Sequence, residues 1–286
     1  MTLDQLLREQ GNKLEAAGVS GAEADLHWIV GAVTHFNRVQ LIINKEFILP
    51  QKQIDQIRQY VDRRCKREPL QYILGSQYFL NLKLKTDKRA LIPRPETELL
   101  AELCISMIKR EYPRFKEFRL LDIGTGTGAL ALGIAKAASN VRAIGVDISY
   151  EALSLARENC RACKLEERVE LRYSDIFSGV ENEMFDGIVS NPPYIPSKVV
   201  DELEPEVKDY EPRLALDGGE YGFDFYYRII TNAARYLKSG GFIALEAEHF
   251  QFDPIRDLLK KTEQFTQGVC ISDYSGQSRI CWAKKL

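Results

Sequence analysis

An apolar strand that runs into a glycine-rich turn and then into a helix constrains the fold of this chain more than any other segment. The stretch Leu120–Ala129 reads LLDIGTGTGA, and a helical pattern continues to Ala138. Glycines at such a turn let the backbone reverse tightly and let a ligand approach it closely. Strands and helices keep alternating after this unit, which predicts an α/β fold with a largely parallel sheet covered on both faces.

A second strand, Val141–Val146, ends at Asp147. An acidic residue at about this distance beyond a glycine turn, roughly 20 residues, can bind the ribose hydroxyls of a cofactor. The glycine turn also satisfies the dinucleotide pattern through Gly124, Gly126 and Ala129. The alternative for Asp147 is an N-cap of the helix that follows. The series therefore predicts a nucleoside cofactor, either a nicotinamide dinucleotide or S-adenosylmethionine.

Four residues, Asn191, Pro192, Pro193 and Tyr194, decide between these cofactors. They follow the apolar run Phe185–Ser190, so we expect them at the carboxyl end of a buried strand. The Asn191 side-chain oxygen and the Pro192 carbonyl can accept the two N–H groups of a planar nitrogen, the prolines stiffen the loop, and the Tyr194 ring can stack on the flat group. The alternative is a proline-rich turn. A hydride-transfer enzyme has no need of an amide clamp beside its cofactor, whereas a methyltransferase does, which favours S-adenosylmethionine.

The chain has two parts of different character. Residues 1–75 show helical periodicity only and predict a small N-terminal helical bundle. Residues 76–95 are expected to be a linker with a β-hairpin, because Gln77–Thr86 alternates apolar and polar side chains like one strand of such a hairpin. Residues 96–286 should form the α/β domain.

Further elements alternate through that domain. The expected strands are Arg168–Tyr173, Phe185–Ser190 and Gly241–Ala247, and the expected helices are Ala152–Ala162 and Phe225–Leu237. Two tail segments, Gln267–Ile271 and Arg279–Ala283, predict a C-terminal antiparallel hairpin. Residues 197–222 are long and polar for a connection, so we expect a functional loop over the substrate site.

Composition excludes several classes of protein. With 286 residues, 45% of them hydrophobic and 28% charged, the chain is an ordinary globular one. The net charge of −2 argues against a broad nucleic-acid-binding surface. No apolar run approaches the roughly 18 residues that span a membrane. Six scattered cysteines and an N-terminus without targeting character predict free thiols in the cytoplasm.

Additional motifs give the chain a family resemblance. They are Glu68–Gly75, Leu91–Glu98, Glu211–Gly219 and Asp273–Arg279. With the glycine turn and the Asn-Pro-Pro-Tyr loop, the chain from about residue 65 onward resembles the protein-(glutamine-N5) methyltransferases that modify peptide chain release factors. The related ribosomal-protein glutamine methyltransferases tend to differ around Arg94-Pro95, which favours release factors here.

The resemblance implies a Rossmann-like methyltransferase sheet and a set of site residues. Those that would hold S-adenosylmethionine are Gly124, Thr125, Gly126, Thr127, Gly128 and Asp147, with Asp175 and Ile176 bordering the adenine and Asn191 adjoining the cofactor. Asn191–Tyr194 would hold the substrate glutamine, which lies in the glycine-rich loop of a class I release factor. Glu211 and Arg213 would either contact the peptide around that glutamine or form an ion pair that orders the long loop.

Two positions depart from the family pattern. Some members carry an aromatic residue in place of Ile176, so apolar packing against the adenine is expected here. The family usually has a glycine two residues after Glu246, whereas this chain has Glu248 followed by His249. That difference affects either the floor of the cofactor pocket or only a loop.

The expected mechanism is direct displacement at the sulfonium methyl, with Asn191, Pro192 and Tyr194 as catalytic residues and positioning as the main source of acceleration. The N-terminal bundle, which this chemistry does not require, is interpreted as a docking surface for the release factor, or else as a stabiliser of the catalytic domain. We expect a monomer that does not bind nucleic acid or membranes. The alternatives are a ribosomal-protein glutamine methyltransferase, a nucleic-acid adenine-N6 methyltransferase that extrudes its base, and a non-enzymatic protein that binds S-adenosylmethionine.

Overall fold

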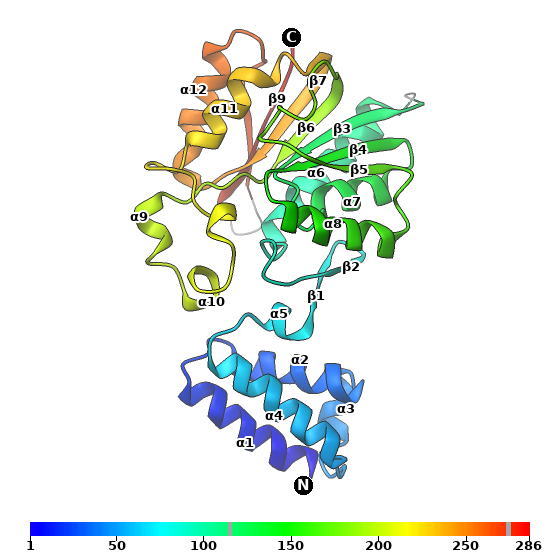
Figure 1. Ribbon diagram of the computed structural model, residues 1–286, viewed down its shortest axis with the longest axis vertical. Coiled ribbons are helices and arrows are strands. Elements are labelled where there is room, and N and C mark those ends of the chain that lie inside the picture. Colours follow the sequence, from blue (N-terminus) through cyan, green and yellow to red (C-terminus); the bar gives the residue numbers. More distant parts are fainter. Residues whose placement is uncertain (114–115, 273–275) are drawn as a thin grey trace. The chain divides into compact units, whose positions relative to one another are not determined.

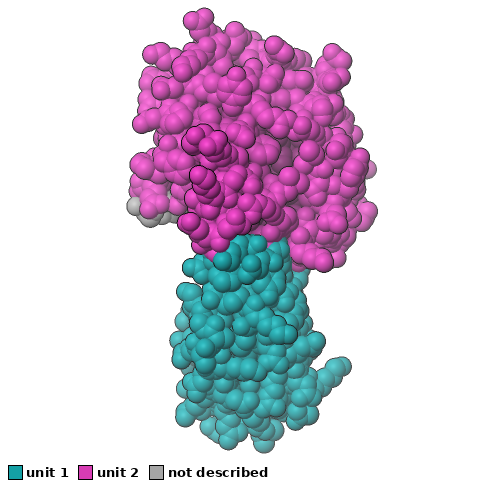
Figure 2. Space-filling view, turned by 60° about the vertical axis from the view of Figure 1, so that its left-hand side comes forward, with its two compact units in different colours: residues 1–76, 204–210 teal, residues 77–203, 211–286 magenta. Residues whose placement is uncertain are grey.

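The chain divides into two compact units. The computed structural model describes residues 1–113, 116–272 and 276–286 (Figure 1). Unit 1 comprises Met1–Ser76 and the separate segment Glu204–Tyr210, and unit 2 comprises Gln77–Leu203 and Glu211–Leu286 (Figure 2). The residues expected to form a linker, 76–95, therefore belong almost entirely to unit 2.

Unit 1 is a bundle of short helices, as the periodicity of residues 1–75 predicts. Its helices are α1 (Leu3–Ala16), α2 (Ala22–Thr34), α3 (Arg38–Ile43), α4 (Gln51–Cys65), α5 (Leu70–Leu74) and α10 (Pro205–Lys208). Apolar residues at helical spacing bury one face of α1, α2 and α4, with Leu6, Ile29 and Ile57 fully buried. Trp28 lies outside this core with 62% of its surface exposed.

Unit 2 is built on a seven-stranded sheet with the strand order β5-β4-β3-β6-β7-β9-β8. The strands are β3 (Phe118–Ile123), β4 (Val141–Asp147), β5 (Val169–Tyr173), β6 (Phe185–Ser190), β7 (Leu237–Glu246), β8 (Val269–Ser272) and β9 (Ser278–Lys284). The first five are parallel, and β9 pairs antiparallel with both β7 and β8. The sheet is therefore mostly parallel with a C-terminal antiparallel hairpin, as expected.

Helices cover both faces of this sheet (Figure 1). Helices α6 (Pro95–Glu111) and α7 (Ala129–Ala137) bury their apolar residues in one cluster, which α8 (Tyr150–Cys163) joins through Cys160. Helices α11 (Asp224–Ala233) and α12 (Phe252–Lys261) bury theirs in the other. Because each central strand has helices on both sides, β6 is buried at every position.

Several elements differ from the sequence-based expectation. Residues 77–86 contain parts of two strands rather than one, because β1 (Ser76–Phe79) and β2 (Leu82–Lys85) form a complete hairpin. Leu80 turns the chain between them with a φ of 50°, and its N–H donates to Glu98 Oε1 over 2.8 Å. Helices α6 and α12 are additions that the sequence reading did not include.

The long connection of residues 197–222 is ordered by three short helices. They are α9 (Ser197–Val200), α10 and the 3-10 helix η1 (Arg213–Ala215). Residues 273–275 of the C-terminal motif lie outside the described residues. None of the described helices is long and apolar enough to cross a membrane.

Candidate functional site

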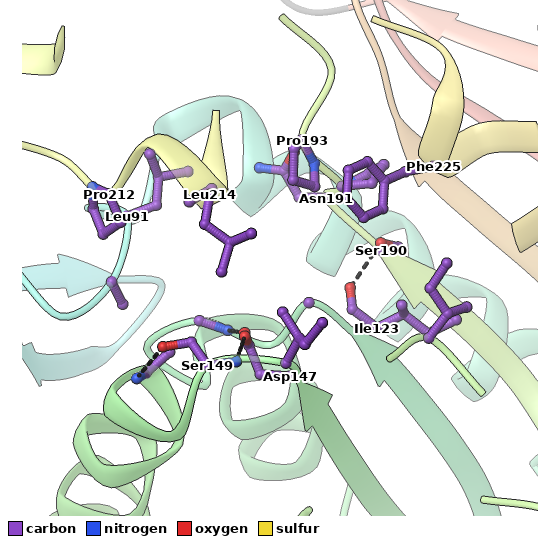
Figure 3. Close-up of a pocket in the computed structure, with 18 of the residues that line it drawn as sticks. Leu91, Ile123, Asp147, Ser149, Ser190, Asn191, Pro193, Pro212, Leu214 and Phe225 are labelled. Atoms are coloured by element: carbon purple, nitrogen blue, oxygen red, sulfur yellow. Dashed lines mark hydrogen bonds between the residues drawn. The ribbon is translucent and has the colours of Figure 1, made fainter. Parts of the chain in front are cut away.

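The carboxyl ends of the central strands meet at one edge of the unit 2 sheet. Ile123 of β3 pairs in register with Val146 of β4 and Ser190 of β6, so the loops that follow these three strands begin side by side. A cavity of about 120 Å³ opens at this edge. Its walls come from the glycine turn, the loops after β4, β5 and β6, and the later part of the 197–222 connection (Figure 3).

The glycine turn after β3 uses conformations that other residues rarely adopt. Gly124, Gly126 and Gly128 have φ angles of 71°, 55° and 84°. Gly124 and Gly126 line the cavity, while Thr125 and Thr127 are buried and do not line it. Thr125 and Thr127 thus help to form the turn, with no place among the cavity-lining residues.

Asp122, which the sequence reading did not single out as a site residue, holds this turn. Its Oδ2 accepts a hydrogen bond from Thr125 Oγ1 over 2.7 Å and another from the Ala131 N–H over 3.1 Å. Burial raises the pKa of Asp122 to about 7, and its Oδ1 is buried without a partner among the described residues. The sequence signal for this role is an acidic residue within an apolar strand, just before a glycine-rich turn.

Asp147 lies on the floor of the cavity at the end of β4. Its Oδ2 accepts a hydrogen bond from the Gly126 N–H and its Oδ1 from the Ser149 N–H, both over 2.9 Å. Burial raises the pKa of Asp147. The N-cap of α8 is Ser149, whose hydroxyl accepts from the Ala152 N–H. The N-cap alternative for Asp147 is therefore wrong.

Asp175 and Ile176 also line the cavity, just after β5. Asp175 forms an ion pair with Arg228 of α11 over 2.6 Å. Ile176 has a φ of 57°, an unusual conformation for a β-branched residue, and presents an apolar wall.

Glu248 has a role in a loop. Its side chain caps the short 3-10 helix η2 (His249–Gln251) and pairs with Arg279 over 2.7 Å. Neither Glu248 nor His249 lines the cavity. The departure from the family pattern at Glu248 therefore affects a loop and does not change the residues that line the cavity.

The Asn-Pro-Pro-Tyr loop forms the wall opposite Asp147 (Figure 3). Asn191, Pro192 and Pro193 line the cavity. Tyr194 packs beside it against the apolar cluster under α11 and α12, and its carbonyl accepts a hydrogen bond from Gln251 Nε2 over 3.0 Å. Burial raises the pKa of the Tyr194 hydroxyl, so that group stays protonated at neutral pH.

Asn191 is fixed from behind by two further residues. Its Nδ2 donates to Thr97 Oγ1 over 3.0 Å, and Thr97 Oγ1 donates to Glu246 Oε2 over 2.7 Å. Both partners are buried, Thr97 in the first turn of α6 and Glu246 at the end of β7. The sequence reading assigned no role to either side chain.

Glu211 and Arg213 do not pair with each other. Glu211 is buried, accepts the Ile92 N–H over 3.2 Å and forms an ion pair with Arg94, while burial raises the pKa of its carboxyl group. Arg213 is about half exposed and pairs with Asp201 over 2.7 Å and with Asp217 over 3.2 Å. Both residues therefore order the long connection, and contact with a substrate peptide stays a prediction.

The residues next to Glu211 and Arg213 in the sequence lie at the cavity itself. Pro212, Leu214 and Ala215 line the cavity, with Leu214 extending between the two walls (Figure 3). The segment just before them belongs to unit 1, where Glu206 accepts hydrogen bonds from Arg64 over 2.8 Å and Arg67 over 2.6 Å. The same connection thus contributes to the helical unit and to the wall of the cavity.

Comparison with known families matches both units. Residues 5–75 match the model of the PrmC N-terminal domain, and residues 98–204 match that of the methyltransferase small domain. The chain is 37% identical over 279 residues to the release factor glutamine methyltransferase of Geobacter sulfurreducens and 33% identical over 280 residues to that of Caulobacter vibrioides. Each alignment covers 98% of this chain and 95% of the relative.

Solved structures show the same fold at low sequence identity. A methyltransferase from Pyrococcus furiosus aligns with a TM-score of 0.53 and 20% identity, over 79% of this chain and 99% of its own. The hMettl16 catalytic domain, solved with a MAT2A 3′UTR hairpin, aligns with a TM-score of 0.58 and 13% identity, over 79% and 81% of the two chains. These similarities identify the Rossmann-like methyltransferase fold that the motifs imply.

Proposed function

Because the chain belongs to the family of release factor glutamine methyltransferases, we propose that it transfers a methyl group from S-adenosylmethionine to the side-chain amide nitrogen of a glutamine in the glycine-rich loop of a class I peptide chain release factor. The observation that carries this proposal is that Asn191 and Asp147 lie on opposite walls of one cavity (Figure 3). The six cysteines of the chain are free thiols, which supports the proposal that the protein works in a reducing compartment such as the cytoplasm.

The residues on the cavity floor fit this cofactor. The positive φ angles of Gly124 and Gly126 keep side chains away from the space above the turn. An ionised carboxylate has about four acceptor positions, and the backbone N–H groups of Gly126, Ser149 and Ile148 act on that of Asp147, which leaves about one for the ribose hydroxyls. Asp175 and Ile176 border the space left for the base. When bound, S-adenosylmethionine supplies an electrophilic methyl group.

The opposite wall would activate the glutamine by orienting it. An amide nitrogen is a poor nucleophile because its lone pair is delocalised. Asn191 Oδ1 and the Pro192 carbonyl would accept its two N–H groups, and they would bind more strongly as the nitrogen gains positive character. Alignment of bound reactants can supply roughly 7–11 kcal/mol. The methylated nitrogen is strongly acidic and loses its extra proton to water, so no dedicated general base is required.

Labelling with the purified chain tests this proposal. Radiolabelled S-adenosylmethionine would be offered with an intact class I release factor, a ribosomal protein that carries a methylatable glutamine, or adenine-containing duplex DNA. We expect label on one glutamine of the release factor only. Asn191→Ala should lower turnover by orders of magnitude while cofactor binding persists, because the clamp acts in the transition state. Label on the ribosomal protein or on DNA would replace the proposal with the corresponding alternative.

Unit 1 is proposed to dock the folded release factor. Helix α3 exposes Val39, Ile42 and Ile43, with 64%, 57% and 70% of their surfaces accessible, and the 3- and 4-residue spacing places them on one helix face. A group of large apolar side chains left in water is typical of an interaction site. Binding energy from this remote contact would hold the substrate loop in the cavity. One copy of the chain carries both units, so we propose that it acts as a monomer.

A substitution pair tests the docking role. Ile42→Ser with Ile43→Ser should raise KM for the intact release factor severalfold or more while activity on a short loop peptide stays near wild type. Val269→Ser, at an exposed apolar position of unit 2, is the matched control and should leave both activities unchanged. Equal losses on both substrates would indicate that unit 1 only stabilises the enzyme.

A further inference from the structure

The proposed clamp depends on which way the Asn191 amide faces. A side-chain amide has an oxygen that accepts and a nitrogen that donates, and the two groups have nearly the same shape. Only the oxygen can accept an N–H from the substrate, so a clamp with the amide reversed would present donors to donors. Some group in the protein has to select one orientation.

The hydrogen bonds behind Asn191 make this selection. The Thr97 hydroxyl has a single proton, and it donates that proton to Glu246 Oε2 over 2.7 Å. Thr97 Oγ1 can then only accept, which it does from Asn191 Nδ2 over 3.0 Å. None of the described residues donates a hydrogen bond to Asn191 Oδ1, so this oxygen is available to a substrate N–H group.

We propose that Thr97 and Glu246 are positioning residues that orient the Asn191 amide so that its oxygen is available to the substrate nitrogen. This inference rests on the proposed function, because it concerns the same clamp. The direction of each hydrogen bond is set by the one behind it, from the Glu246 carboxylate through the Thr97 hydroxyl to the Asn191 amide.

The location of the pair supports this role. Thr97 and Glu246 have 5% and 2% of their surfaces exposed, so water cannot replace either partner. Thr97 lies in the first turn of α6, Glu246 at the end of β7, and Asn191 just after β6. Three separate elements must therefore pack together to form these two hydrogen bonds. Glu246 has no direct ion pair with any of the described residues, and a buried carboxyl group of this kind is costly. Such groups concentrate at functional sites.

The ionisation of Glu246 gives the proposal a distinctive readout. Burial raises the pKa of Glu246 to about 7. The charged groups that face it are Glu96 and Arg94 at the start of α6 and Arg279 on β9, with Tyr194 and Tyr226 beside it. A protonated Glu246 can donate to Thr97, whose hydroxyl proton can then turn toward Asn191 and favour the reversed amide. Turnover should therefore rise as the pH increases through about 7.

Three substitutions test the pair, with kcat, KM for the release factor and Kd for S-adenosylmethionine measured separately. Thr97→Val keeps the shape and removes the hydroxyl, so kcat should fall about 10- to 100-fold, the scale of a buried hydrogen bond lost without compensation. The Kd should stay near wild type. Thr97→Ser should restore most of the turnover, and Glu246→Gln should flatten the rise of kcat near pH 7.

The outcomes separate this inference from the proposed function. If Asn191→Ala is inactive while Thr97→Val keeps its kcat, the clamp stands and the positioning role is overturned. If Asn191→Ala itself is fully active, the clamp fails and the positioning role fails with it. Should Thr97→Val not fold, Glu246→Gln decides: a pH profile identical to that of the wild type overturns the inference, and a flattened one supports it.

Discussion

Replacement of Asp147 by alanine should weaken cofactor binding by an amount that the structure allows us to estimate. The carboxylate already accepts the N–H groups of Gly126 and Ser149 and is also stabilised by that of Ile148, which leaves about one acceptor position toward the cavity. Loss of a hydrogen bond to a charged group costs about 1.5–3 kcal/mol, so the Kd for S-adenosylmethionine should rise roughly 10- to 150-fold. Asp147→Asn keeps one acceptor oxygen without the charge, so its Kd should lie between those of the wild type and of Asp147→Ala.

The control for this experiment is the helix cap. Ser149→Ala removes the N-cap of α8 and leaves the Asp147 carboxylate in place, so it should cost about 1 kcal/mol of stability. Calorimetric titration gives the Kd of each variant, and thermal unfolding in the absence of cofactor gives its stability. An unchanged Kd for Asp147→Ala would refute the ribose-binding role.

Three further substitutions probe the supporting structure. Gly218→Ala should reduce kcat, because the added Cβ would lie 2.7 Å from the Pro193 carbonyl oxygen and force the substrate loop to move; steady-state kinetics measure this, and a wild-type kcat would contradict it. Gly11→Ala, in the middle of α1 with its nearest neighbour 3.7 Å away, should stabilise the protein by about 0.5–1 kcal/mol in chemical denaturation, whereas a loss of stability would show hidden strain. Burial disfavours the ionised form of Glu206, but hydrogen bonds from Arg67 and Arg64 outweigh it and lower its pKa to about 2 from the ordinary 4.5. Its stabilisation is therefore fully present above pH 4.5 and lost as the pH falls toward 2, so Glu206→Gln should weaken the pH dependence of unfolding in that range; an unaltered dependence would argue against the ion pair.

Local sequence determined the parts of the site that depend on backbone conformation and strand ends. The glycine turn could be located because only glycine adopts positive φ readily at Gly124, Gly126 and Gly128. The apolar runs of β3, β4 and β6 predicted buried parallel strands, and the ends of such strands meet at one edge of the sheet. The sequence alone therefore places Asp147 and Asn191 at one edge of the sheet, where both line the same cavity.

Tertiary structure decided which side chains support those residues. Thr97 lies 94 positions from Asn191, and Glu246 lies 149 positions from Thr97, so no local pattern relates them. The same holds for Glu211, whose ion pair with Arg94 crosses 117 positions. Periodicity reports which face of an element is buried, but the partner of a buried polar group depends on how distant elements pack. The sequence by itself thus determined the positions of the two loops and the class of chemistry, and only the folded chain determined the hydrogen bonds behind Asn191.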